Sequence, residues 1–71
     1  MTINGRVSYQ DIEGGFWGII GSDGSKYVPV EPLPDAFRKD GLRITAEIET
    51  VHMFGTTMWG AHIRIVSICL P

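Results

Sequence analysis

Glycine is the residue type that most restricts what this chain can fold into, because nine of its 71 residues are glycines. Glycine weakens helices and is used in turns, bulges and close approaches between strands. β-Branched and aromatic residues, which favour strands, occupy much of the sequence between the glycines. The chain is therefore predicted to form a small, twisted all-β domain that turns and bends at its glycines.

The short length and the cysteine content limit how such a domain is stabilised. Residues 1–71 suffice for one domain, and chains of this size bury only roughly 60% of the surface that they expose when unfolded. Cys69 is the single cysteine, so no disulfide can form within the chain. The fold is expected to depend on apolar packing and strand pairing, or on a partner subunit.

Apolar and polar residues alternate along several segments, which is the pattern of strands with one buried face. Between two of these segments, Asp23-Gly24 predicts a tight hairpin. The alternation slips near Thr50 and again near Val66, which predicts a bulge or bend at each place. Pro29 has no N–H to donate, so the third strand is expected at a sheet edge. The predicted strands are residues 3–11, 16–20, 26–30, 42–49 and 59–65.

Residues 34–40 have the features of a short helix between the third and fourth strands. Pro34 suits the first helical position, Gly41 suits the left-handed cap, and Phe37 would anchor the helix in the core. This order of three strands, a helix and two strands is that of the OB fold, a five-stranded Greek-key barrel. We therefore predict a small OB-like barrel, with an SH3-like barrel as the alternative.

Several short strings together give the chain a recognisable pattern. Residues 13–19 read EGGFWGI, and DGSKY, LPDAF, DGLR and MWG follow at residues 23–27, 33–37, 40–43 and 58–60. This pattern resembles a family of small, uncharacterised prokaryotic proteins and lipoprotein domains, and the resemblance extends from Gly5 to Ile68. It implies an OB-like barrel of unknown function, with no established site residues to carry over. Residues 51–55 depart from the pattern, so the register of the last hairpin is left open.

The charges are mixed and slightly acidic, with a net charge of -2. Nucleic-acid affinity comes largely from Lys and Arg at phosphates, so this balance argues against a nucleic acid as the main partner. The six basic residues are scattered over five predicted elements, and we expect them on a mixed, solvated surface. No apolar run reaches the roughly 18 residues of a membrane span, and a cytoplasmic location is expected, with a removed signal or lipoprotein anchor as an open alternative.

Aromatic residues are the best candidates for a binding surface. On an OB fold, exposed aromatic side chains near cations can stack against a ligand, and Trp17, Lys26, Tyr27 and Trp59 have the right positions in the sequence. The alternative is that a small barrel uses its aromatic residues as core, which we expect for Phe16. We predict a non-enzymatic module that binds a protein, a peptide or a small ligand, with single-stranded nucleic acid as an alternative.

Two histidines flank the last turn and give a third functional alternative. If that turn is tight, His52 and His62 lie on paired strands and could share a metal ion, although a stable site needs further ligands. No catalytic motif is present, Cys69 has no evident partner, and no cofactor is expected. The chain is expected to be a monomer or a weak homodimer, since strand edges left by incomplete closure can pair between chains.

Overall fold

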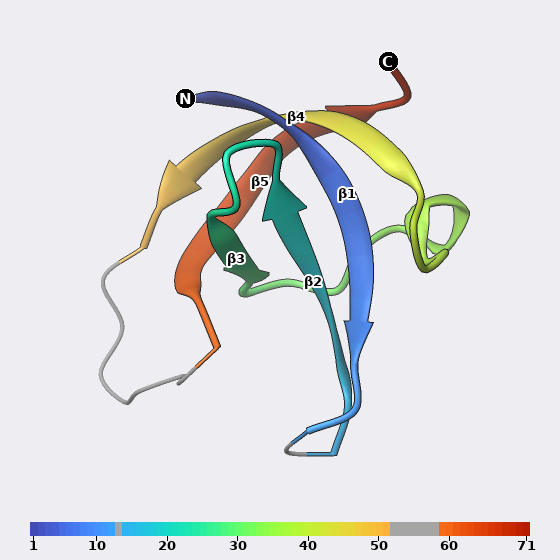
Figure 1. Cartoon of the computed structure of the whole chain (residues 1–71). Coiled ribbons are helices and arrows are strands. Elements are labelled where there is room, and N and C mark those ends of the chain that lie inside the picture. The colour runs from blue at the N-terminus through green and yellow to red at the C-terminus, as the bar shows by residue number, and fades with distance from the viewer. Residues whose placement is uncertain (13, 52–58) are drawn as a thin grey trace.

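The computed structural model describes residues 1–12, 14–51 and 59–71, and these ranges contain five strands. The strands curve around a common interior, as Figure 1 shows. They are β1 (Thr2–Gln10), β2 (Phe16–Gly21), β3 (Lys26–Pro29), β4 (Arg43–Thr50) and β5 (Ala61–Cys69).

The five strands close into a barrel in the order β1-β2-β3-β5-β4, with β4 paired back to β1. β3 and β5 run parallel, while all the other neighbouring strands are antiparallel. The predicted all-β, five-stranded barrel is confirmed, and it is consistent with both an OB-like and an SH3-like barrel.

The segment between β3 and β4 differs from its prediction. Residues 34–40 do not form an α-helix, and the only regular turn there is the 3₁₀ turn η1 (Asp35–Phe37). Arg38 ends this turn with a ψ of 65°, and its guanidinium donates to the carbonyl of Leu33 at 2.8 Å and pairs with Asp35. Leu33, which is 2% exposed, is the core anchor, whereas Phe37 is only partly buried. A segment this short gains too few helical hydrogen bonds to form an α-helix against that packing.

Alternate residues of the strands point into the barrel and form a single core. Val7, Ile19 and Ile63 each have 0% exposure, and no polar side chain of the described residues is buried with them. The core residues are Ile3, Val7, Ile19, Leu33, Ile44, Ala46, Ile48 and Ile63. Because successive side chains on a strand face opposite ways, the residues between these positions face outward and are the ones that a ligand can reach.

The irregularity in the pairing of β4 with β5 lies close to its predicted places. The register shifts between Glu47 and Ile48, where Glu47 pairs with Ser67 and Ile48 pairs with Ile65. Val66 is therefore the extra residue on β5, and it is 58% exposed. The slip predicted near Val66 is confirmed, whereas no bulge occurs at Thr50, because Thr50 itself stays in the ladder; the alternative of a bend there stays a prediction.

Pro29 does not make β3 an edge strand, because β5 pairs with β3 through Pro29. The pairing of β2 with β3 does not need an N–H from Pro29, because these two strands pair only at Lys26 and Tyr27, before the proline. The next residue, Val30, donates its N–H to the carbonyl of Ile63 at 2.9 Å. The expectation of a strand edge is therefore wrong for the β5 side of Pro29.

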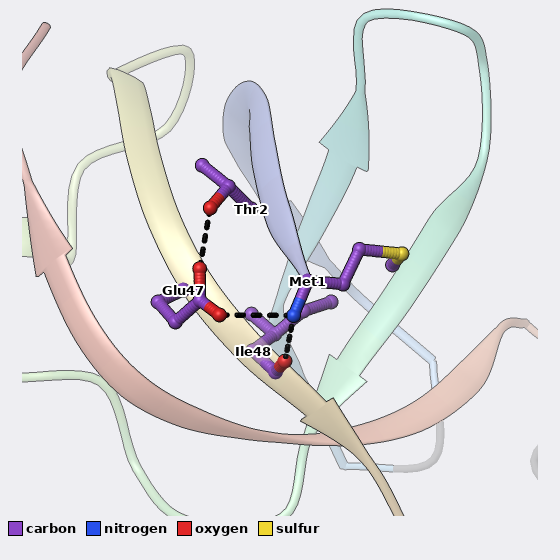
Figure 2. Close-up of polar contacts among 4 residues, drawn as sticks. All are labelled: Met1, Thr2, Glu47 and Ile48. Carbon is purple, nitrogen blue, oxygen red and sulfur yellow. Dashed lines mark hydrogen bonds and ion pairs between the residues drawn. The ribbon is translucent and has the colours of Figure 1, made fainter.

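The amino-terminal residues fasten β1 to β4, as Figure 2 shows. The ammonium group of Met1 donates to the Glu47 carboxylate and to the carbonyl of Ile48, both at 3.0 Å. The hydroxyl of Thr2 donates to the second oxygen of the same carboxylate. These contacts lie at Glu47 and Ile48, where the register between β4 and β5 shifts. They therefore hold β1 against β4 next to the irregular part of the β4–β5 pairing.

Candidate ligand-binding face

The outer face of β2 and β3 carries the strongest candidate for a binding surface. Ile19 points into the core with 0% exposure, so Phe16, Gly18 and Ile20 face outward. Lys26 pairs directly with Ile20 and shares this outer face with it. This is where the loop between β4 and β5 returns to the barrel, at Trp59.

Trp59 packs across this outer face. Its ring meets Phe16 edge-on, with the ring centroids 5.5 Å apart, and the Lys26 ammonium lies 5.7 Å from the Trp59 ring centroid. An ideal Cβ at Gly18 would come within 2.5 Å of the Trp59 ring, so only a glycine leaves room for it there. Aromatic pairs contribute about 0.5–1.5 kcal/mol beyond burial, and an exposed cation–π contact contributes about 0.5–1 kcal/mol.

The predicted binding residues divide between two places. Lys26 and Trp59 come together on the outer face. Trp17 and Tyr27 instead face the interior and pack against the core, and Trp17 also meets Tyr9 edge-on, with centroids 4.9 Å apart. They are therefore not part of the outer face that Lys26 and Trp59 share.

Phe16 is the residue of this face that sequence reasoning missed. It was expected in the core, but its ring lies beside Trp59 on the outside of β2 and is only partly buried. Its position three residues before Ile19 was the available signal, because an inward Ile19 requires an outward Phe16 in a regular strand.

Strand pairing places three cations in one row, contrary to the expectation that the basic residues are scattered. Arg43 of β4 pairs with Arg6 of β1, Arg6 pairs with Ile20 of β2, and Ile20 pairs with Lys26 of β3. At about 4.8 Å between strands, the row is about 14 Å across. No ion pair joins any of the three cations to an acidic residue of the described ranges.

The residues considered for metal binding are not brought together among those described. His62 lies partly buried on β5 opposite Val28, and Cys69 is exposed near the end of the same strand. Residues 1–12, 14–51 and 59–71 contain no group of three possible metal-binding side chains. His52 lies outside these ranges, so a metal site shared by His52 and His62 stays a prediction.

Among the described residues, three groups have shifted pKa values, and each shift has a local structural cause. The backbone N–H of Ser25 donates to Asp23 at 2.9 Å and lowers the pKa of that carboxyl. The Thr2 hydroxyl, followed by the terminal ammonium, lowers the pKa of Glu47. The carboxylate of Glu49 raises the pKa of Arg64. All three groups lie at the surface.

Comparisons with known proteins add no relatives to these observations. No family model matches the chain, and no curated protein or solved structure matches it significantly. The resemblance to small prokaryotic barrel proteins therefore stays a prediction. Within the described residues, no helix has the length and the apolar character needed to cross a membrane.

Proposed function

We propose that this chain is a non-enzymatic binding module that holds a small ligand or a peptide segment against the outer face of β2 and β3. The observation that supports this is the position of Trp59, which packs over Gly18 with Phe16 and Lys26 beside it. Aromatic rings next to an ammonium group suit a planar, apolar ligand that carries a negative charge.

The arrangement of strands in the barrel also supports the outer face of β2 and β3 as the binding surface. In OB folds, strands β2 and β3 and the loops beside them form the ligand-binding surface. The Greek-key order, in which β3 pairs in parallel with β5, favours an OB-like over an SH3-like barrel. This part of the proposal is an analogy between folds, since fold alone does not determine function.

Amide and indole NMR spectra of the labelled chain test the proposal, with 2-naphthoate as an aromatic carboxylate probe and cyclohexanecarboxylate as its aliphatic counterpart. We expect 2-naphthoate to shift the signals of Phe16, Lys26 and Trp59 more strongly than the aliphatic acid does. Trp59→Ala should abolish these shifts, whereas Trp17→Phe, which changes the other tryptophan, should keep them. Shifts that persist in Trp59→Ala, or that gather at Trp17, would contradict the proposal.

Single-stranded nucleic acid is a second candidate, and the row of three cations favours it. The row runs from Lys26, which contacts Trp59, to Arg43 on the far strand, so phosphates could follow it from the aromatic face. A mixed-sequence single-stranded oligonucleotide should then shift the signals of Arg6, Lys26 and Arg43 at low salt, and the shifts should fade as salt rises. An absence of shifts at high oligonucleotide concentration would remove this candidate.

A further inference from the structure

A hollow on the barrel surface begins at Ile20, beside the face that Trp59 covers. It is a pocket of about 670 Å³ over the middle of β1, between β4 and the hairpin that joins β2 to β3. Pockets of roughly 300–1,000 Å³ are the size that small-molecule ligands occupy. Its polar side chains are Asn4, Arg6, Ser22 and Arg43.

Two of these side chains repel each other. Arg6 and Arg43 are direct partners on β1 and β4, and like charges directly opposite on paired strands destabilise a sheet. Neither guanidinium forms a side-chain hydrogen bond or an ion pair with another described residue. The two cations therefore share a concave surface that no acidic side chain lines, although Pro71, the last residue of the sequence, lies at its wall.

The other polar side chains of the pocket can also donate hydrogen bonds. The Asn4 side-chain oxygen accepts from the Thr45 hydroxyl at 2.8 Å, which leaves the amide N–H groups of Asn4 available. Ser22 adds a hydroxyl, and none of the lining side chains is acidic. The carboxylate of Asp23 in the adjacent hairpin accepts from the Ser25 N–H and lines a smaller hollow, which borders this pocket at Asn4, Gly21 and Ser22.

We propose that this pocket binds an oxyanion, the phosphate or carboxylate group of a small molecule, seated between Arg6 and Arg43. Guanidinium groups donate paired, charge-assisted hydrogen bonds to such groups, and the bound charge removes the repulsion between the two arginines. The pocket adjoins the Trp59 face at Ile20, but its two arginines lie on β1 and β4, so the inference does not rest on the aromatic binding proposed for Trp59, Phe16 and Lys26.

Calorimetric and NMR titrations with phenyl phosphate and benzoate, at constant ionic strength, test this inference and distinguish the two kinds of oxyanion. We expect saturable binding of at least one probe, with shifts at Arg6, Arg43 and Asn4. Arg6→Gln or Arg43→Gln should weaken that binding on the order of tenfold, as expected for the loss of a charged hydrogen bond. Tighter binding of phenyl phosphate would identify a phosphate site, and tighter binding of benzoate a carboxylate site.

Lys39→Gln is the matched control, because it removes one exposed positive charge away from the pocket. It should leave the affinity unchanged, as should Trp59→Ala. The bound probe should also raise the melting temperature of the wild-type chain but not that of the Arg6→Gln/Arg43→Gln double variant. Equal weakening by Lys39→Gln and Arg6→Gln, or no saturable binding at millimolar probe, would overturn the inference.

Discussion

Gly18 shows how one missing side chain shapes the candidate binding face. The outward position of Gly18 on β2 is filled by the ring of Trp59, which comes from the other end of the sequence. A larger residue would push that ring away from Phe16 and Lys26, although β2 itself could still pair with both of its neighbours.

Gly18→Ala is therefore expected to lower the free energy of unfolding by roughly 1–3 kcal/mol, the usual cost of overpacking a well-filled site. The added methyl group would lie 2.5 Å from the Trp59 ring, so the ring must move. Urea unfolding of both proteins, with tryptophan fluorescence in a Trp17→Phe background, measures the cost and the new environment of Trp59.

Trp59→Ala provides the control for this prediction through a double-mutant cycle. If the cost of Gly18→Ala comes from the Trp59 ring, it should largely disappear once the ring is removed. An equal cost in both backgrounds would mean that the methyl group strains β2 itself, and that Trp59 does not depend on Gly18 for its place.

At the scale of the elements, the alternation of apolar and polar residues predicts individual strands, but it does not predict which strands pair or in which register. The run from 42 to 49 predicts β4 because its inward residues, among them Ile44 and Ile48, recur every two positions. The row of Arg43, Arg6 and Lys26 could not be predicted, because it depends on the registers of three separate strand pairs. Register is decided by packing between segments that are distant in sequence.

The segment between β3 and β4 has a helical turn as predicted, but a shorter one, for a related reason. Pro34 and Gly41 are favourable helix ends, but local preferences are weak when only six residues lie between them, and tertiary packing decides the outcome. Leu33, placed just before the expected helix, is the residue that the core accepts. The inward direction of Trp17 and Tyr27 could not be predicted, because it depends on the strand pairing, and their part in binding stays a prediction.

The anchoring role of Leu33 leads to a comparison between two substitutions in this segment. Leu33→Ala should lower the free energy of unfolding by about 2–5 kcal/mol, because Leu33 is 2% exposed and its loss leaves a cavity. Phe37→Ala should cost clearly less, because Phe37 is only partly buried against the core. Urea unfolding of both variants provides the comparison, and a larger cost for Phe37→Ala would restore Phe37 as the anchor.

For the whole molecule, closure of the barrel bears on association between chains. Each strand has a hydrogen-bonded neighbour on both sides along at least part of its length, so no complete strand edge is left for a second chain. We expect sedimentation equilibrium to show a monomer at protein concentrations up to about 1 mM, the dissociation constant of a weak complex. A dimer that forms in this range would show that association uses side-chain surfaces rather than strand edges.

The contacts that fasten β1 to β4 predict how stability depends on pH. The Thr2 hydroxyl, and then the terminal ammonium, lower the pKa of the exposed Glu47 carboxyl below its ordinary 4.5. A lowered folded-state pKa stabilises the fold above the unfolded value, and this stabilisation is lost as the pH falls through the folded value. The stability advantage of the wild type over Glu47→Gln should therefore be present near neutral pH and shrink below about pH 4.5.

Thr2→Val separates the two causes, because it removes the hydroxyl and keeps the shape of the side chain. It should raise the pKa of Glu47 toward 4.5, as read from the carboxyl ¹³C shift during a pH titration. Thr45→Val, whose hydroxyl donates to Asn4 instead, is the matched control and should leave that titration unchanged. If Glu47 titrates alike in Thr2→Val and the wild type, the hydroxyl does not hold the carboxylate. The terminal ammonium of Met1 would then be the group that lowers the pKa of Glu47.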